Sequence, residues 1–389
     1  MHGLRQILTV TALSFRGLHN RIWSSLVVVT GVGFVVAVLI SVLSLTAGIT
    51  RSYAVGAGPQ RVIVLSAGAR SEGDSGLSHE AANFIKDLPG LTKVQDGSPL
   101  ADTEVVGSVP TTKKLSGLNA TLMVRGLGPK GLLLHPGLRI VSGRMFRPGA
   151  REAIIGIAAQ QQFADLALGQ TVTLHHGRWL VVGAFKADGN ILESQLIADA
   201  DTVMPALGHK TYSSVIADLA SPGRFASFKR DLSRNPAFKV TAERQSDYYA
   251  RATKTFSGFF QAVAYILGGL MAIGAVFGTV NTLYSAVSAR AREIATLRAL
   301  GFGALAVATS VMLEALFLSL TGAILGAAIA WLLFDGHQKV LGNDVFSLSV
   351  SLPLAGIGIV WACAIALIGA ALPSVRAARM TIAVALRTV

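Results

Sequence analysis

Four stretches of this chain carry almost no charge, and each is long enough to cross a lipid bilayer. A transmembrane helix needs about 20 mainly apolar residues to span roughly 30 Å of hydrocarbon. The stretches are residues 22–50, 255–289, 299–334 (with Glu314 inside it) and 345–375. Only 14% of the 389 residues are charged, against about a quarter in soluble proteins. We therefore expect an α-helical membrane protein with four transmembrane helices.

The distribution of basic residues predicts how these helices are oriented, because Lys and Arg are retained on the cytoplasmic side. The N-terminal segment, the link between the second and third spans, and the C-terminal tail each have a basic excess, whereas the loop between the third and fourth spans has none. We expect a multi-pass protein of the inner (plasma) membrane with both termini in the cytoplasm. The residues concerned are Arg5, Arg16, Arg21, Arg290, Arg292, Arg298, Arg376, Arg379 and Arg387.

This orientation divides the chain into segments. Residues 1–21 form a cytoplasmic N-terminal segment, 22–50 the first helix, and 51–254 a large mixed α/β extracytoplasmic domain. Residues 255–389 hold the other three helices, at about 257–285, 303–334 and 352–373. The net charge of +13 could also indicate nucleic-acid binding, but the charge is mixed within residues 51–254, so we expect no nucleic-acid partner. A cleaved signal peptide is the alternative for the first span, although its apolar region usually has only about 7–15 residues.

Local patterns predict several elements of the extracytoplasmic domain. Residues 61–68 read as a strand and residues 71–76 as a solvated loop. A helix is expected after Ser78 as its N-cap, and a second helix before Pro236. The runs QTVTL and RWLVVGAF indicate a β-hairpin.

Signals for catalysis are missing from the sequence. His175 and His176 are adjacent, so on a strand they would point to opposite faces, and we interpret them as a hairpin tip rather than a metal site. No nucleophile elbow and no HExxH pair occur. The phosphate-binding loop of ATPases is also missing, so we expect no catalysis, no metal and no cofactor in this chain.

Small and polar residues mark positions inside the predicted spans. Gly274 and Gly278, and likewise Gly322 and Gly326, have the spacing that lets helix backbones approach closely, which indicates tight packing or dimerisation. Glu314 is expected to face protein or water, because a carboxylate in hydrocarbon costs a few kcal/mol. We expect a structural partner near Asn281; a proton relay is the alternative.

The link between the second and third spans predicts an amphipathic helix at the inner membrane surface. Ile294, Leu297 and Leu300 are expected on one side, and Arg290 and Glu293 can pair across one turn. The link is either a flank that only sets topology or a docking element for a soluble partner.

Several of these motifs together resemble a known family. The run VSARAREIATLRALG after Asn281, the glycine-rich helix after Glu314 and the tail LPSVRAARM resemble the FtsX-like permease domain of ABC transporters, as found in macrolide-exporter and lipoprotein-release permeases. The segment SFRGLHNR ahead of the first span is similar to the same family. GLRIVSGRMF, REAIIG, LGQTVTL and WLVVGAF resemble its MacB-type periplasmic core domain.

This resemblance implies a mechanism and its partners. Such permeases act as dimers, so a second permease copy or paralogue is expected, together with a separate ATPase subunit that binds ATP and Mg. The resemblance leaves open whether a periplasmic adaptor protein and an outer-membrane duct complete the route. By similarity, the residues that couple to the ATPase are Arg290, Arg292, Glu293, Ile294, Leu297, Arg298 and Gly301.

Three functions compete at this stage. The leading one is a permease subunit whose extracytoplasmic domain moves when the ATPase hydrolyses ATP, which drives export or extraction of a hydrophobic molecule, peptide or lipoprotein. The alternative is a non-transporting FtsX-type regulator that activates a cell-wall hydrolase; a domain of about 200 residues is larger than that role needs. The third, a membrane-anchored enzyme or sensor, has no catalytic motif in its favour.

Overall fold

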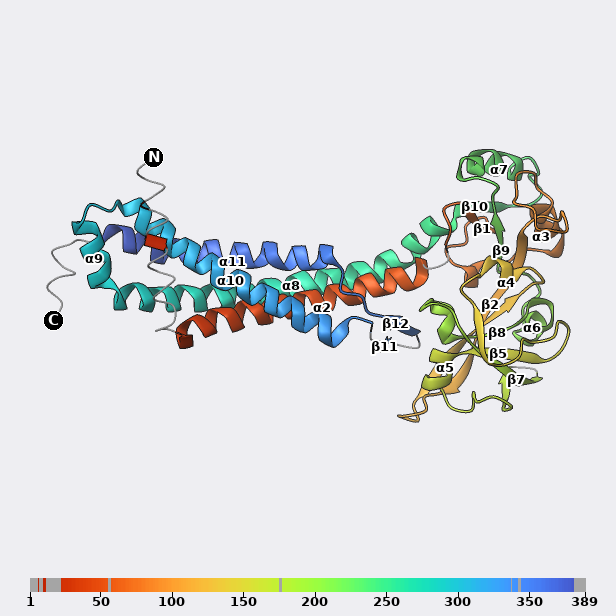
Figure 1. Ribbon diagram of the computed structural model, residues 1–389. Helices are drawn as coiled ribbons and strands as arrows, with labels where there is room; N and C mark the ends of the chain where they lie inside the picture. Colours follow the sequence, from red (N-terminus) through yellow and green to blue (C-terminus); the bar gives the residue numbers. More distant parts are fainter. Residues whose placement is uncertain are drawn as a thin grey trace. The chain divides into compact units, whose positions relative to one another are not determined.

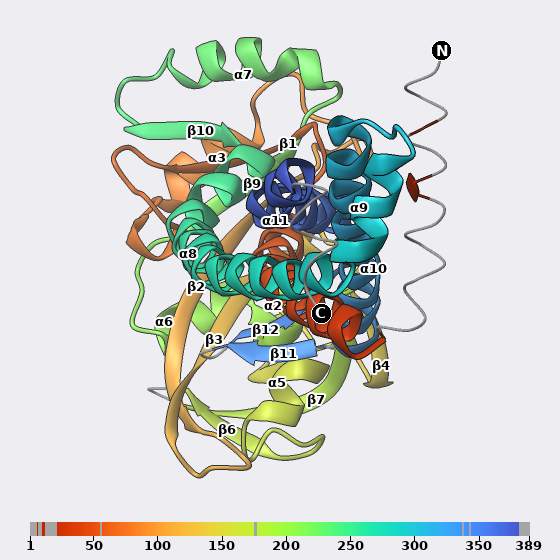
Figure 2. The same ribbon diagram turned by 90° about the vertical axis from the view of Figure 1, so that its left-hand side faces the viewer.

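The computed structural model describes residues 6, 10–11, 22–54, 57–174, 177–336, 338–341 and 344–380, which group into two compact units (Figures 1 and 2). The helical unit comprises Met1–Ala47, Gly258–His337 and Leu348–Val389, and the sheet domain comprises Gly48–Ser257 and Gln338–Ser347. Most of the predicted N-terminal segment, the pair His175 and His176, and the tail beyond residue 380 lie outside the described residues.

Four long helices carry the apolar stretches of the sequence. They are α2 (Ile22–Ala54), α8 (Gln245–Ala289), α10 (Ala304–Phe334) and α11 (Leu352–Arg379). Each contains a segment long and apolar enough to cross a membrane, which confirms the four expected spans. A short helix, α9 (Ala291–Ala299), connects α8 to α10.

The core of the helical unit forms around α2. Val32, Val36 and Ile40 of α2 are fully buried, and they pack in one cluster with Ala323 of α10 and Ala362 of α11. Small residues on α10 and α11 leave room for the branched side chains of α2, as is common where helices associate within lipid. Large apolar side chains on the outer faces of α8 and α10 remain exposed, which suits contact with hydrocarbon.

Ten strands of the described residues form one mixed sheet. Its order is β10-β1-β9-β2-β3-β8-β5-β7-β4, with β6 paired to β7. Most pairs are antiparallel, whereas β3 with β8 and β5 with β7 are parallel. The strands are β1 (Arg61–Ser66), β2 (Ala101–Thr112), β3 (Asn119–Leu127), β4 (Arg139–Gly143), β5 (Glu152–Gly156), β6 (Thr171–Leu174), β7 (Gly177–Lys186), β8 (Gln195–Asp199), β9 (Ser214–Asp218) and β10 (Val240–Arg244).

Short helices complete the sheet domain and cover the two faces of the sheet. Side chains of α3, α5, α6 and α7 join the largest core cluster on one face. The first turns of α8 and helix α4 lie against the other face at β1 and β9. The short helices are α3 (His79–Lys86), α4 (Gly131–Leu134), α5 (Ile157–Gln162), α6 (Ala200–Ala206), α7 (Phe225–Leu232) and the 3-10 turns η2 (Glu72–Asp74), η3 (Ile191–Ser194) and η4 (Pro222–Arg224).

The structure confirms several local predictions for this domain. Ser78 is the N-cap of α3, and its hydroxyl oxygen accepts a hydrogen bond from the Ala81 N–H at 3.1 Å. The two expected hairpin strands, β6 and β7, pair antiparallel, with Leu174 opposite Gly177. Helix α7 ends at Leu232, before Pro236 as expected.

The prediction of a solvated loop at residues 71–76 is wrong for Glu72. This residue begins η2 and is buried, and its carboxylate pairs with the guanidinium of Arg125 from β3. The polar composition of the segment indicated exposure. The partner that makes burial tolerable lies 53 residues further along the chain.

A second hairpin belongs to the sheet domain although the sequence places it between the last two spans. Strands β11 (Gln338–Leu341) and β12 (Asp344–Ser347) pair antiparallel, and β12 packs against α5 and η3. The sequence analysis treated this segment only as a short connecting loop.

Candidate functional site

The helix α9 is fixed to its surroundings by one apolar face. Ile294 and Ala295 are buried, and Ile294 packs with Val287, Val307 and Ala377. These partners come from the end of α8, the start of α10 and the end of α11. Helix α9 is therefore part of a packed helix junction rather than a free amphipathic segment.

Arg298 ties α9 to the end of α11. Its guanidinium donates hydrogen bonds to the carbonyl oxygen of Ala378 at 2.5 Å and to that of Met380 at 3.3 Å. The last carbonyl groups of a helix have no partner within the helix, and a cation there also interacts favourably with the helix dipole. Arg298 thus holds α9 on α11.

Arg290 joins α9 to α10. Its Nε lies 3.1 Å from a carboxylate oxygen of Glu293, which confirms the expected pair across one turn. A terminal nitrogen of the same guanidinium lies 3.3 Å from Glu314 of α10, whose side chain is buried. Glu314 therefore has a structural cation as partner, supplied by the link, whereas the side chain of Asn281 is exposed. Carboxylates inside membrane segments usually have such partners.

The remaining residues of the link form an exposed surface. Arg292, Glu293 and Thr296 are exposed on α9. Leu300, expected on the same side as Ile294, is instead 72% exposed, because α9 ends at Ala299 and the chain then turns at Gly301, where φ is +92°. Leu305, at the start of α10, is 74% exposed. We call Arg292, Thr296, Leu300 and Leu305 the link surface.

The link residues singled out by sequence therefore separate into two groups. Arg290, Ile294 and Arg298 make contacts within the helical unit, and Leu297 is half-buried. Arg292 and Glu293 point to solvent. The sequence analysis missed Leu305. This leucine lies just beyond the end of the link and outside the expected amphipathic period, and its position beside the link was the signal that could have indicated it.

The two glycine pairs differ in their surroundings. A Cβ added to Gly322 would lie 2.5 Å from the carbonyl oxygen of Val29, and one added to Gly326 would lie 2.2 Å from that of Gly33. The backbones of α10 and α2 thus approach each other at this pair. A Cβ at Gly274 or Gly278 would meet nothing within 4 Å among the described residues.

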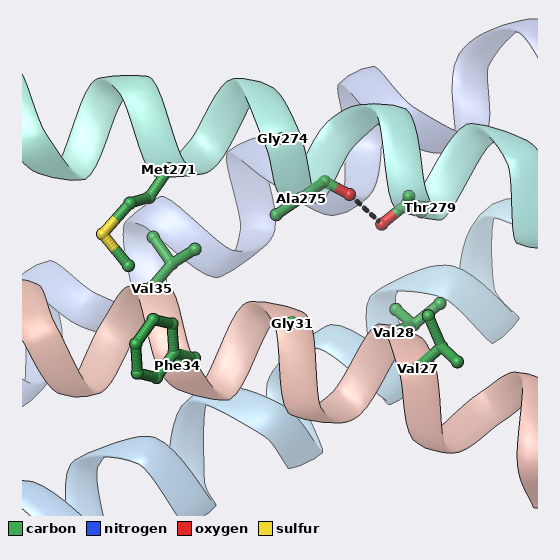
Figure 3. A pocket seen from close by; sticks show the side chains of 10 residues that line it. Val27, Val28, Gly31, Phe34, Val35, Met271, Gly274, Ala275 and Thr279 are labelled. Carbon is green, nitrogen blue, oxygen red and sulfur yellow. Dashed lines mark hydrogen bonds between the residues drawn. The ribbon is translucent and has the colours of Figure 1, made fainter.

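Gly274 and Gly278 line an apolar groove between α2 and α8 (Figure 3). The groove has a volume of about 320 Å³, and Gly31 and Phe34 of α2 lie on its opposite wall. The hydroxyl of Thr279, which also lines it, is satisfied within α8 by a 2.8 Å hydrogen bond to the carbonyl oxygen of Ala275. The groove therefore offers small residues and apolar side chains without a polar group that needs a partner.

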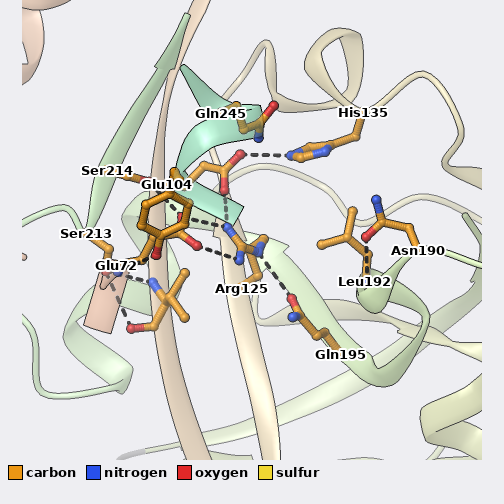
Figure 4. Close-up of polar contacts among 12 residues, drawn as sticks. Glu72, Glu104, Arg125, His135, Asn190, Leu192, Gln195, Ser213, Ser214 and Gln245 are labelled. Atoms are coloured by element: carbon orange, nitrogen blue, oxygen red, sulfur yellow. Dashed lines mark hydrogen bonds and ion pairs between the residues drawn. The ribbon is translucent and has the colours of Figure 1, made fainter. Parts of the chain in front are cut away.

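Metal ligation has no support in the described part of the chain, where no group of three or more His, Cys, Asp or Glu side chains lies close enough to hold an ion. A buried ion cluster in the sheet domain surrounds Arg125 (Figure 4). Burial opposes the charge of Glu104 there, but Arg125 and His135 outweigh it and lower the pKa of Glu104 to about 2.

Comparisons with known proteins agree with this architecture. Residues 25–235 match the family model of the MacB-like periplasmic core domain, and residues 265–382 match the model of the FtsX-like permease C-terminal domain. A search of curated proteins gives no match. Four apolar helices joined to this mixed α/β domain define an ABC transporter permease of the inner membrane. The chain belongs to the FtsX-like and MacB-like permease family.

Solved structures with similarity to the chain cover its sheet domain. The periplasmic region of MacB from Actinobacillus actinomycetemcomitans has 15% identity and a TM-score of 0.38, with coverage of 51% of this chain and 94% of that one. The extracellular domain of the noncanonic ABC-type transporter YknZ from Gram-positive bacteria has 16% identity and a TM-score of 0.36, with coverage of 47% and 99%. A permease domain from Porphyromonas gingivalis has 15% identity and a TM-score of 0.31, with coverage of 47% and 87%. Family membership implies an ABC ATPase partner and an oligomer.

Proposed function

We propose that this chain is the permease subunit of an ABC transporter in which a separate ATPase chain drives movement of the sheet domain. The movement exports or extracts a hydrophobic molecule, peptide or lipoprotein. The observation that supports this most directly is the construction of α9, which is exposed on one side and bonded to α8, α10 and α11 on the other. A partner that pushes on α9 would therefore displace three helices together.

The link surface is the docking site for the ATPase in this proposal. It combines an exposed basic residue, Arg292, with two exposed leucines, Leu300 and Leu305. Exposed apolar side chains surrounded by polar ones are typical of protein interfaces. In this arrangement both termini and α9 are cytoplasmic and the sheet domain is outside.

The groove between α2 and α8 is the proposed contact with a second permease copy or a paralogue. Gly31, Gly274 and Gly278 allow a helix to approach closely there, whereas Gly322 and Gly326 are already used within the chain.

Co-purification tests the docking proposal. A tagged full-length chain is purified from its native membranes in mild detergent, and ATP hydrolysis in the eluate measures the bound ATPase. We expect Arg292→Glu and Leu300→Asp each to reduce the bound activity about tenfold or more, as for central interface residues.

Matched controls for this experiment are exposed residues of the sheet domain. Lys229→Glu on α7 and Leu115→Asp at the tip of the β2–β3 hairpin make the same chemical changes at exposed positions. They should leave the bound activity unchanged. Equal retention of ATPase by the link variants and the controls would rule out docking at the link surface.

A non-transporting regulator of cell-wall hydrolysis is the alternative function, and a different measurement distinguishes it. Such a chain would still retain the ATPase. It would differ in having a cell-wall hydrolase bound to the sheet domain and no cargo in purified vesicles.

A further inference from the structure

A groove within the sheet domain follows strand β6. Its volume is about 370 Å³, and its walls are formed by residues 110–112 of β2, 164–166 and 171–173 of β6. A pocket on the face of a sheet is lined by alternate residues of a strand, because successive side chains point to opposite faces. Consecutive residues of two strands therefore indicate that this groove, which we call the β6 groove, runs along strand edges.

Strand β6 is paired along one of its two edges, to β7. In an antiparallel pair, successive residues alternately bond to the partner strand and point away from it. The Val181 N–H donates to the carbonyl oxygen of Gln170 at 2.9 Å, whereas the N–H of the neighbouring Leu180 donates in the opposite direction, to a residue just before β5. Gln170 thus bonds to β7, and the backbone groups of Thr171 and Thr173 point away from it.

These outward backbone groups have no partner in the part of the chain that the structure describes. Neither Thr171 nor Thr173 makes a hydrogen bond beyond the pairing of β6 with β7. Both residues are exposed, and both line the β6 groove. A strand edge with free N–H and C=O groups is a template for one more strand.

The opposite wall of the β6 groove is closed to such pairing. Pro110 of β2 has no N–H to donate. The carbonyl oxygen of Thr112, two residues further on and facing the same edge, already accepts a hydrogen bond from the Ala164 N–H at 3.0 Å. Proline at an edge is a common way to prevent pairing with another chain. The edge of β6 is therefore the side of the groove at which a strand can bind.

The two end strands of the sheet carry features that oppose pairing, and β6 does not. Strand β4 has a bulge between Ile140 and Ser142. Strand β10 follows Lys239 and ends with Glu243 and Arg244. Bulges and charged side chains are common protection for exposed edges. The sequence of β6, TVTL, has no charge and no proline, and its register with β7 is regular.

The side chains around the groove indicate which strand would fit. Val172 packs against the main core of the domain, and Leu166 is buried in that core. A residue opposite Val172 would place its side chain on the same face, beside these apolar groups. Its two neighbours would face outward beside Thr171 and Thr173. A volume near the lower end for ligand pockets suits a few residues of extended chain.

We propose that the β6 groove binds an extended peptide segment of another polypeptide, which adds to the free edge of β6 as one more strand. Backbone hydrogen bonds to Thr171 and Thr173 supply the affinity, and an apolar side chain beside Val172 supplies the preference. The segment alternates polar and apolar residues. The site belongs to the sheet domain alone, and it rests on the proposed function only for its use in transport.

Fluorescence anisotropy with a defined peptide tests this site. The probe has the core Thr-Val-Thr-Val-Thr, a Lys-Glu pair at each end and a fluorescein label. It is titrated with the full-length chain in lipid nanodiscs, with empty nanodiscs to correct for binding to lipid. We expect saturable binding. A peptide N-methylated at its three threonines keeps every side chain but loses the N–H groups that face β6, so it should bind about tenfold more weakly or worse.

Thr173→Pro tests the same edge from the side of the protein. It removes the outward N–H of Thr173 and leaves the hydrogen bonds between β6 and β7 in place, so binding of the probe should weaken about tenfold or more. Val240→Pro is the matched control at the first residue of β10, where a strand tolerates proline. This variant should bind the probe as the parent does. Thermal unfolding verifies that both variants are folded.

Three results would overturn the proposal. They are the lack of saturable binding by the parent, equal binding of the methylated peptide, and undiminished binding by folded Thr173→Pro. If Thr173→Pro does not fold, the methylated peptide decides the question alone. The outcome is separable from that of the proposed function, because no ATPase is present. A chain that retains the ATPase but not the probe would lose only this site, and the reverse result would leave the site standing.

Discussion

Glu314 is a carboxylate on an apolar helix, and its partner is a guanidinium from the link that precedes that helix. Arg290 approaches Glu314 within 3.3 Å, and both side chains are largely buried. An ion pair in this position fixes α9 against α10, because removing either group leaves the other, largely buried charge without this partner. The alternative of a proton relay would require Glu314 to release and accept protons.

Substitutions at Glu314 distinguish these roles. Glu314→Leu leaves Arg290 without this partner and should lower the stability of the helical unit by about 3 kcal/mol. Glu314→Gln keeps an oxygen acceptor for Arg290. It should therefore lower the stability of the helical unit by less and leave transport intact. Thermal unfolding of the purified chain in detergent measures the stability of both Glu314 variants. Glu293→Gln, at the exposed partner of Arg290, is the control. Complete loss of transport in the Gln variant with normal stability would indicate protonation chemistry instead.

Asp102 on β2 is a buried carboxylate that forms no salt bridge with the described residues. Its Oδ1 accepts a hydrogen bond from the Thr103 N–H at 3.0 Å, and its Oδ2 has no partner among the described residues. Burial, together with the charge of Glu104, raises its pKa from 3.8 to about 7. At a pH between these two values, the folded chain keeps a proton on Asp102 that the unfolded chain releases.

This raised pKa gives stability a definite pH dependence. The contribution of protonated Asp102 to the stability of the folded chain is fully present below about pH 4. It is lost as the pH rises through about 7. Asp102→Asn cannot ionise, so it should be more stable than the parent at pH 8, by on the order of 2–4 kcal/mol, and similar to it near pH 4. The difference in unfolding temperature between variant and parent at pH 4.5 and pH 8 measures this. A difference that does not change with pH would contradict the assignment.

At the scale of elements, the two glycine pairs differ in what lies beside them. The pair on α10 packs against the backbone of α2, whereas the pair on α8 faces open space among the described residues. A Cβ at Gly326 would meet a backbone oxygen of α2, which cannot move as a side chain could. Gly326→Ala should therefore lower the stability of the helical unit by about 1–3 kcal/mol. Gly274→Ala, at a position that is open within the chain, should not lower the stability of the helical unit. Unfolding temperatures in detergent compare the two variants, and equal losses would mean that both glycines are packed.

Sequence patterns predicted the elements whose signal is local. The four spans follow from uncharged stretches, and the hairpin β6–β7 and the cap at Ser78 follow from short motifs. The end of α9 was misjudged, because the period that placed Leu300 beside Ile294 assumed that the helix continues. The exposure of Leu300 follows from where the helix ends, and Gly301 was the signal for that end.

At the scale of the whole molecule, the basic flanks predict the orientation in the membrane, and this prediction can be tested directly. In a Cys363→Ala background, Lys229→Cys on α7 should react with an impermeant maleimide in intact spheroplasts. Ala299→Cys, exposed at the end of α9, should react only after the membrane is permeabilised. The opposite pattern would reverse the topology and place the link surface out of reach of an ATPase.

Long-range pairings are what the sequence could not predict at this scale. Glu72 and Arg125 read as ordinary charged residues of a loop and a strand, and nothing in either segment indicates the other. Their pairing depends on how η2 is placed beside β3 by the sheet, which is decided by the register of several strands together. The same holds for Arg298 and the end of α11, 80 residues apart in sequence.

The hairpin β11–β12 has a practical consequence for anyone who wishes to isolate the sheet domain. A soluble fragment cut at the ends of α2 and α8 would lack the strand that packs on α5 and η3, because that strand is encoded between the last two membrane helices. Such a fragment would leave an uncovered patch on its surface and would be prone to self-association. Grafting residues 338–347 onto it through a flexible tether should restore a monodisperse preparation.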